Sequence, residues 1–145
     1  MLIWPKHVTV GLCCLISCDG SIHLRSPKDR LKHNRKPNSG FIDIFNSVEI
    51  EWAKNIQKIL LEHKIGTSLG NRYRTDIKKN YYVLRLNRRY PKQIRKGMDQ
   101  YQIFRNSIEY WNAQQYLIKR KYEALCKMTK LIPVICSPKT QSSIS

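Results

Sequence analysis

The first twenty residues carry a hydrophobic pattern that predicts one helix ending in a turn. Its apolar positions recur at a spacing of about 3.6 residues, which places them on one helix face. These positions are Val8, Leu12, Leu15 and Ile16. A second row contains only small residues, Gly11, Cys14 and Cys18, so another helix could pack closely along it. Asp19 and Gly20 then end the helix, because Gly readily takes the positive φ that reverses a chain.

Residues 21–25 alternate between polar and apolar side chains, as a half-buried strand does. We expect Ile22 and Leu24 to face the core. The residues that this turns outward are Ser21, His23 and Arg25. Donors and a cation on one face of a strand suit phosphates and base edges.

Residues 40–46 predict a second strand with a less regular pattern. We expect Ile42 and Ile44 in the core, which turns Asp43 outward. The same assignment leaves Phe41 and Phe45 on the polar face, and alternation does not explain them.

A basic hairpin loop is expected between these two strands, in residues 26–39. The segment contains two prolines and a run of cations that includes Lys28, Arg30 and Lys32. It connects two strands that already present polar groups outward.

A second helix is predicted after residue 46. Ser47 could cap it, and Glu49 and Glu51 in the first turn would favour its dipole. One side of this helix carries its larger ring and aliphatic side chains, Trp52, Ile56, Ile59, Leu60 and His63. We expect Gly66 to end it.

A second strand pair is predicted in residues 67–74 and 81–87, joined by a loop that contains Lys78 and Lys79. In the later strand Tyr82, Leu84 and Leu86 share one face. The opposite face carries Tyr81, Val83, Arg85 and Asn87. Arg72 and Arg74 likewise share a face of their strand, so both strands turn arginines outward. Arginine is the residue best shaped for guanine edges.

The rest of the chain is predicted to be helical. Residues 88–98 read as a basic helical stretch, and residues 103–125 as one or two helices. Their apolar anchors are Phe104, Ile108, Trp111, Leu117 and Tyr122. The order α-β-β-α-β-β-α-α indicates an α+β fold, with one antiparallel four-stranded sheet, helices on one face and a basic opposite face. We expect one domain over residues 1–130 and a disordered tail at 131–145.

The charge of the chain points to a polyanionic partner. The 145 residues contain 27 Lys and Arg against 10 Asp and Glu, a net charge of +17. Such a field attracts nucleic acid and accelerates its encounter with the protein. No apolar run is long enough to span a bilayer, so nucleic acid is favoured over a membrane.

The five cysteines form no CxxC pair, which favours small buried thiols in a reducing compartment. We therefore expect an intracellular location. The enrichment in Lys, Asn, Ile and Tyr suits an AT-rich coding source such as an organelle or a mobile intron. The expected location is therefore a mitochondrion or chloroplast, with archaeal or bacterial cytoplasm as the alternative.

The segment 12–20 resembles the signature of the LAGLIDADG homing endonucleases. The match runs Leu12, Cys13 for Ala, Cys14 for Gly, Leu15, Ile16, Ser17 for Asp, Cys18 for Ala, Asp19 and Gly20. Asp19 keeps the acidic position with which the family holds catalytic metal, whereas Ser17 replaces the first acidic residue. The other interpretation is an ordinary amphipathic helix that ends at an Asp-Gly turn. The predicted element order agrees with the family architecture over residues 8–125.

The resemblance implies half of a DNA-binding saddle that is completed by a second copy of the chain. The implied homodimer interface is the first helix, through Gly11, Cys14, Leu15 and Cys18. Two copies of Asp19, with the carbonyl of Cys18, would then hold Mg²⁺ for phosphodiester cleavage. By the same resemblance, Asn46 and Lys96 are the candidates for the remaining catalytic positions; Asp99 aligns with the family's lysine position, and Arg95 and Lys96 lie near it.

The implied partner is double-stranded DNA with a long, nearly palindromic site. The candidate DNA-binding residues are Ser21, His23, Arg25, Lys28, Arg30, Lys32, Asp43, Arg72, Arg74, Lys78, Lys79, Tyr81 and Arg85. Two alternatives stay open. One is an intron RNA maturase, which needs the basic surface without Asp19, and the other is a DNA-binding protein that does not cleave.

Overall fold

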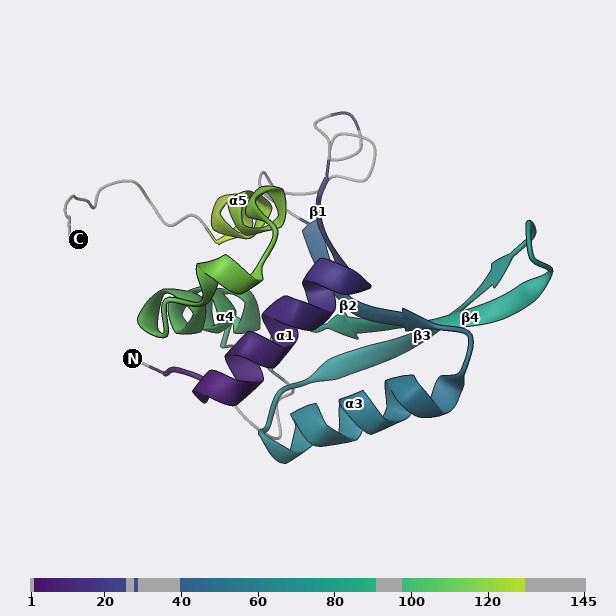
Figure 1. Cartoon of the computed structure of the whole chain (residues 1–145), viewed down its shortest axis with the longest axis horizontal. Helices are drawn as coiled ribbons and strands as arrows, with labels where there is room; N and C mark the ends of the chain where they lie inside the picture. Colours follow the sequence, from purple (N-terminus) through teal and green to yellow (C-terminus); the bar gives the residue numbers. More distant parts are fainter. Residues whose placement is uncertain (1, 26–27, 29–39, 91–97, 130–145) are drawn as a thin grey trace.

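The chain forms an α+β fold in a computed structural model that describes residues 2–25, 28, 40–90 and 98–129 (Figure 1). Its elements in chain order are α1 (Lys6–Cys18), β1 (Ser21–Leu24), β2 (Gly40–Ser47), α3 (Ile50–Glu62), β3 (Thr67–Arg74), β4 (Lys79–Leu86), α4 (Gln100–Tyr110), the 3₁₀ helix η1 (Ala113–Tyr116) and α5 (Lys119–Met128). The predicted order is confirmed through β4, and the two helices that follow, α4 and α5, lie largely within the stretch predicted as one or two helices and are separated by η1.

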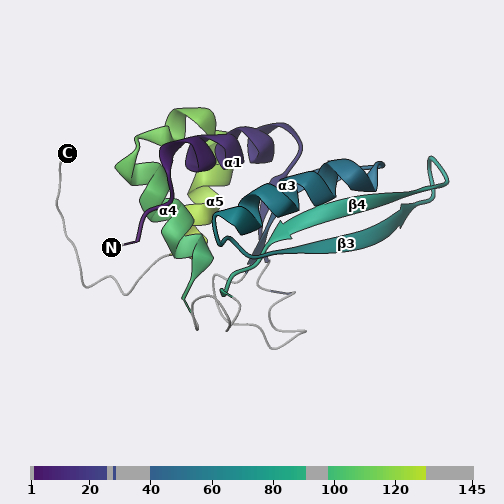
Figure 2. The same cartoon turned by 90° about the horizontal axis from the view of Figure 1, so that it is seen from below.

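The four strands form one antiparallel sheet in the order β1-β2-β4-β3. The two views show α1, α3, α4 and α5 gathered on one side of this sheet (Figures 1 and 2). No helix in the described part of the chain covers the opposite side, which we call the outer face. The prediction of helices on one face is confirmed.

The core lies between the sheet and the helices. Its fully buried side chains come from α1, the two central strands and α4, and they include Leu12, Ile16, Ile42, Ile44, Leu84, Leu86, Phe104 and Ile108. Burial of each such side chain contributes about 1.5–3 kcal/mol to stability. The hydrophobic periodicity that predicted these elements therefore also identified most of the residues that hold them together.

The start of the chain is fastened to its later helices by Trp4, whose side chain is buried. The Trp4 backbone N–H donates to the Ser107 hydroxyl at 2.8 Å, and its indole N–H donates to the Tyr90 hydroxyl at 2.9 Å. The Trp4 carbonyl accepts from the Trp111 indole at 2.8 Å. These bonds place the beginning of α1 against α4.

A β-bulge in β2 accounts for the irregular pattern of residues 40–46. Asp43 pairs with Arg85, but the next pair is Phe45 with Leu84, so Ile44 is an extra residue. The bulge turns Ile44 and Phe45 toward the helices, where Ile44 is fully buried and Phe45 packs against the core. The prediction that placed Phe45 on the polar face was therefore wrong beyond the bulge.

The ends of α3 differ from the predicted ones. The helix begins at Ile50, because Ser47 ends β2 and its hydroxyl accepts from the Glu49 N–H at 3.0 Å. At the other end Lys64 takes a φ of 63°, and the Ile65 N–H donates to the Leu60 carbonyl at 2.9 Å. Lysine thus occupies the left-handed position that sequence reasoning gave to glycine.

Gly66, which was predicted to end α3, instead forms hydrogen bonds with the start of α4. Its N–H donates to the Gln100 side-chain oxygen at 2.8 Å, and the Gln100 amide donates back to the Gly66 carbonyl at 2.9 Å. Gln100 is fully buried, so this pair of bonds joins the start of β3 to the start of α4.

The buried face of α3 was predicted only in part, because Leu60 is buried and Ile56 packs against the core as expected. Ala53 and Leu60 are buried, whereas Trp52 and Ile59 are 60% and 55% exposed. The two rows are one residue apart, which is about 100° around a helix. A helix rotated by one residue thus leaves a large apolar surface uncovered.

The predicted helix at 88–98 is wrong in its described part. Residues 88–90 are not helical: the Tyr90 N–H donates to the Met98 carbonyl at 3.0 Å, and Arg89 forms a bridge with Asp99. Asp99 itself caps α4 by accepting from the N–H groups of Tyr101 and Gln102. The tail predicted at 131–145 lies outside the described residues.

Candidate nucleic-acid interface

Asp19 stands at the C-terminal end of α1, as the sequence predicted. It is the C-cap residue, its side chain is exposed, and its N–H donates to the Leu15 carbonyl at 2.8 Å. The carboxylate is therefore accessible beside the carbonyl end of a helix. Such an end carries partial negative charge, so this position needs compensation.

Gly20 is required here by a close approach. A Cβ atom on Gly20 would lie 2.2 Å from the Asp43 carbonyl oxygen and 2.7 Å from that of Ile44. The predicted positive φ is absent, so this expectation was wrong. The turn after α1 crosses β2 at its bulge, and only glycine leaves room for the two backbones.

The bulge also brings Asn46 to Asp19. Because Ile44 is the extra residue, Asn46 pairs with Val83 and lies on the outer face. Its side-chain amide donates to the Asp19 carbonyl at 3.0 Å. Two residues that sequence analysis assigned to one site, 27 positions apart, are therefore in contact.

Lys121 supplies the cation that the end of α1 needs. Its amine donates to the carbonyls of Ile16 at 2.6 Å, Ser17 at 3.4 Å and Gly20 at 2.9 Å, and the residue is only 6% exposed. Burial lowers the pKa of the Lys121 amine, and neighbouring Arg120 lowers it further. Sequence reasoning missed this residue because α5 brings it from 101 positions away.

Ser17 joins α1 to the C-terminal helices. Its hydroxyl donates to the Tyr116 carbonyl at 3.0 Å and accepts from the Ile118 N–H at 3.1 Å. Both hydrogen-bonding roles of the hydroxyl are used within the fold. Ser17 therefore packs the segment that precedes Lys121 against α1.

The outer face gathers most of the predicted DNA-binding residues. Ser21, Asp43, Arg85 and Ser68 form one row across all four strands, and His23 pairs with Phe41 beside it. Farther along the face, Arg72 pairs with Tyr81 and Arg74 with Lys79. The predicted residues that share this face are Ser21, His23, Asp43, Arg72, Arg74, Lys79, Tyr81 and Arg85. The alternation along each strand placed all of them except Lys79, which was predicted in the connecting loop and instead begins β4.

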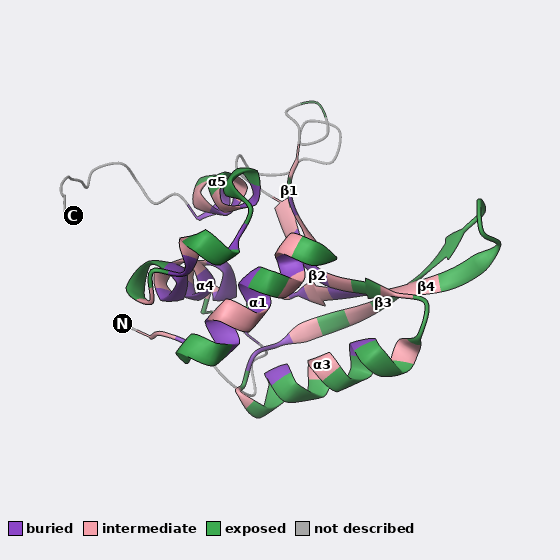
Figure 3. Cartoon of the chain, in the orientation of Figure 1, coloured by how far each residue is buried: buried purple, intermediate pink, exposed green. Residues whose placement is uncertain are grey.

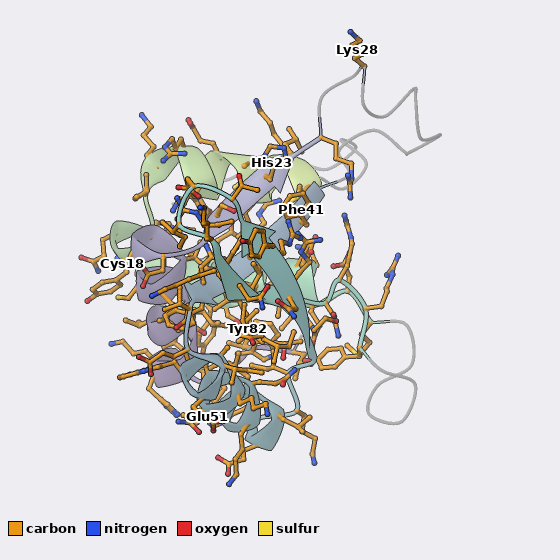
Figure 4. All side chains as sticks on the ribbon, turned by 90° about the vertical axis from the view of Figure 1, so that its right-hand side faces the viewer. Cys18, His23, Lys28, Phe41, Glu51 and Tyr82 are labelled. Atoms are coloured by element: carbon orange, nitrogen blue, oxygen red, sulfur yellow. The ribbon has the colours of Figure 1, made fainter. Side chains whose placement is uncertain are left out.

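Four residues of this face, His23, Phe41, Asp43 and Arg85, form what we call the central patch. The rings of His23 and Phe41 stack with centroids 5.0 Å apart, and Figure 4 shows these two side chains side by side. The Arg85 guanidinium carbon lies 4.0 Å from the centre of the Phe41 ring. Arg85 also donates to both carboxylate oxygens of Asp43, at 2.7 and 3.4 Å. Phe41, which alternation left unexplained, is the platform of the patch.

Residues 70–80, which we call the arm, extend the β3–β4 hairpin beyond the helices (Figure 1). Every residue of the arm is exposed, and the arm is green in Figure 3. Arg74 forms an ion pair with Asp76, with its Nε 3.1 Å from the carboxylate. Lys78 stands at the turn with a φ of 52°.

A hollow of about 450 Å³ lies where the arm meets the end of β2. It is lined by Asn46, Ser47, Val48, Arg74, Ile77 and Tyr81. Asn46 therefore borders this hollow and also holds the backbone of Asp19.

The predicted dimer row lies open on α1. A Cβ on Gly11 would meet no atom within 4 Å, and Cys14 and Cys18 are exposed. Leu15 is half-buried beside an apolar groove of about 170 Å³ between α1 and α3. This groove is lined by His7, Val8, Gly11, Leu12, Leu15, Ile56, Ile59, Leu60 and His63.

The neighbouring cysteine behaves differently. Cys13 is fully buried, and burial raises the pKa of its thiol to about 12. A thiol with so high a pKa stays protonated and is a poor nucleophile.

Some predicted residues cannot be placed. Arg30, Lys32 and Lys96 lie outside the described residues, while Lys28 is described and exposed. Arg25 approaches the Phe41 ring, with its guanidinium carbon 5.6 Å from the ring centre. Within the described ranges, no three His, Cys, Asp or Glu residues stand close enough to hold a metal ion, and no helix could cross a membrane.

Comparison with known proteins identifies no relative. No protein-family model matches the chain, and neither the curated proteins nor the solved structures contain a significant match.

Proposed function

We propose that the chain is a site-specific double-stranded DNA endonuclease that acts as a homodimer with Mg²⁺. One observation carries the proposal: Asp19, whose side chain is exposed, is hydrogen-bonded through its backbone carbonyl to Asn46 on a polar and basic sheet face. That combination joins a candidate metal ligand to a candidate DNA-binding surface.

The charge distribution supports DNA as the partner. The chain has a net charge of +17, and the outer face presents Arg72 and Arg74 on β3 and Arg85 on the neighbouring β4. A two-stranded ribbon fits the major groove of B-form DNA. The phosphates would supply most of the affinity, and base edges the specificity.

The residues at the end of α1 fit half of a metal site. One chain offers the Asp19 carboxylate and the neighbouring Cys18 carbonyl, and hard oxygen ligands of this kind suit Mg²⁺. A second copy of Asp19 would bring the paired carboxylates of a two-metal phosphodiester cleavage site. A bound divalent ion would stabilise the charge that develops on the scissile phosphate and would activate a water.

The chain's own residues then have separate tasks. Asp19 would bind the ion, and Asn46 fixes the backbone of Asp19 through its carbonyl. Lys121 neutralises the carbonyl end of α1, so that a carboxylate is tolerated there.

The open row on α1 supports the homodimer. Two helices with Gly11 at their crossing could approach closely, and two-fold packing of one row on itself is the commonest interface between identical chains. The apolar groove beside it, with the exposed Ile59 and half-buried Leu15, would be covered in such a dimer.

The test is cleavage of a randomised duplex DNA library in Mg²⁺ and in Ca²⁺. We expect breaks at one long site with Mg²⁺ alone. Asp19→Asn should abolish cleavage and retain binding, while Glu62→Gln, an exposed acid on the helix side, should cleave normally. Breaks that persist in Asp19→Asn would reject the proposed metal ligand.

A second candidate is a DNA-binding protein that does not cleave. The lysine contacts favour it, because Lys121 already engages carbonyls on both sides of Asp19, and Ser17 has a structural role in place of a second acid. Specific binding without breaks in Mg²⁺ would select this candidate. Preference for structured RNA over duplex DNA in competition would instead select the maturase.

A further inference from the structure

We propose that Arg85 reads one guanine in each half of the DNA site, and that Asp43 and Phe41 hold its guanidinium for this contact. The inference rests on the proposed binding of duplex DNA by the outer face. It adds the base that is read, the residue that reads it and the two residues that position it.

Asp43 occupies one edge of the guanidinium and leaves the other free. The carboxylate accepts from Nε at 2.7 Å and from Nη2 at 3.4 Å, which is the side of the guanidinium nearest the main chain. A guanidinium has five N–H groups in a fixed plane. The parallel N–H groups at its outer end, one on Nη1 and one on Nη2, are not needed for this pair. Those two groups form the fork that matches a pair of acceptors.

Phe41 fixes the plane of the same group. Its ring centre lies 4.0 Å from the Arg85 guanidinium carbon, and the ring is itself stacked on His23. An arginine held by an edge and by a face has lost its rotational freedom before any ligand arrives. Because the side chain is already ordered, DNA binding does not include the entropic cost of ordering it.

The backbone under Arg85 is equally well fixed. Its neighbours Leu84 and Leu86 are fully buried, so the strand is anchored on both sides, and alternation turns Arg85 to the outer face. The Arg85 side chain remains 31% exposed, against 13% for Asp43. The guanidinium can thus be reached from the groove of a bound duplex, while its partner is mostly shielded.

The electrostatics favour a base over a phosphate. Asp43 offsets the positive charge of Arg85, which weakens any attraction to a phosphate but does not remove the fork. Guanine presents two acceptors, O6 and N7, to the major groove without a net charge, and a bidentate arginine is the most common contact to them. A neutralised and immobilised fork fits that edge better than it fits the backbone.

The experiment is a selection from randomised duplex DNA in Ca²⁺, with the base preference measured at every position. The wild-type chain should select guanine at one position in each half-site. Arg85→Lys keeps the charge but lacks the fork, so it should reduce the preference at that position by about tenfold and leave the other positions unchanged. Arg105→Lys, on α4 and the helix side of the sheet, is the matched control and should select as the wild type does.

Asp43→Asn gives a second, independent readout. It removes a negative charge and keeps the side-chain shape, so total DNA affinity should rise while the guanine preference falls. It also covers the case in which Arg85→Lys does not fold, as judged from its thermal unfolding.

Three results would overturn the inference. Unchanged base preferences in Arg85→Lys would show that Arg85 reads no base, and the proposed function would stand. Equal weakening on all sequences would assign Arg85 to a phosphate. Failure of the wild-type chain to bind duplex DNA would overturn the proposed function itself, and the inference with it.

Discussion

One arginine–aspartate pair lies at the centre of the β-sheet and another at the turn of the β3–β4 hairpin, and they are held in different ways. Arg85 and Asp43 come from neighbouring strands at the centre of the sheet, and their side chains are 31% and 13% exposed. Arg74 and Asp76 lie two residues apart on the arm, and their side chains are 52% and 60% exposed. The same two residue types therefore form a fixed group in one place and a solvated one in the other.

The surroundings explain the difference. The central pair rests on Phe41 and on a strand with buried neighbours, and the nearby end of α1 is held by Lys121 and Asn46. The arm has no covering element among the described residues, and each of its side chains meets water. A fixed centre suits the reading of bases, while an exposed arm suits adaptable contacts with phosphates.

The largest expected effect is a loss of stability when the cation at the end of α1, Lys121, is removed. Lys121→Met should lower the free energy of unfolding by about 3 kcal/mol, because carbonyls at the end of α1 lose a charged donor. Urea unfolding with an unchanged m-value measures the loss. Lys119→Met, at an exposed position of the same helix, should change stability by no more than about 0.5 kcal/mol. Equal losses in the two variants would show that the contacts of Lys121 are not what stabilises the centre.

A smaller effect distinguishes the two ion pairs directly. A double-mutant cycle with Arg85→Gln and Asp43→Asn should give a coupling free energy of about 1 kcal/mol, because both partners are partly shielded and charge-assisted. The corresponding cycle with Arg74→Gln and Asp76→Asn should show a clearly smaller coupling, because both side chains are solvated. The comparison fails if the arm pair couples as strongly as the central one.

The smallest effect is a titration on the arm. The hydrogen bond from Arg74 lowers the pKa of the Asp76 carboxyl below its ordinary value. The pair therefore stabilises the folded chain at pH values above the pKa that Asp76 has in the unfolded chain. This contribution is lost as the pH falls through the lower pKa of the folded chain. Arg74→Gln should raise the pKa of Asp76, and so should high salt, as followed by NMR of the carboxyl carbon. If neither Arg74→Gln nor high salt raises the pKa of Asp76, a group other than Arg74 lowers that pKa.

The sequence predicts well those parts of the fold that depend on local periodicity. The helix before Asp19, the four strands and the outward row of arginines follow from spacings of two or of about 3.6 residues. The partnership of Asp19 and Asn46 was also predicted, but only through the family resemblance. Local hydrophobic patterns do not indicate that the end of α1 and the end of β2 lie close together in space.

The remainder depends on contacts that periodicity does not encode. The extra residue in β2 has no local signature, because Ile44 is apolar whichever face it takes. The position of Lys121 depends on how α5 packs, 101 residues from Gly20. The rotation of α3 was missed because Trp52 is the more hydrophobic candidate, yet the small Ala53 lets the helix lie closer to the sheet.

The hydrogen bonds that Trp4 forms with later residues affect how the chain folds during its synthesis on the ribosome. Its partners Ser107 and Trp111 are translated more than 100 residues later. Translation adds about 5–20 residues per second, so these partners are synthesised on the order of 5–20 s after the first helix. During that interval its apolar row has no α4 to pack against, so the newly made segment is exposed to chaperones and proteases. The chain can complete its fold only after most of it has left the exit tunnel.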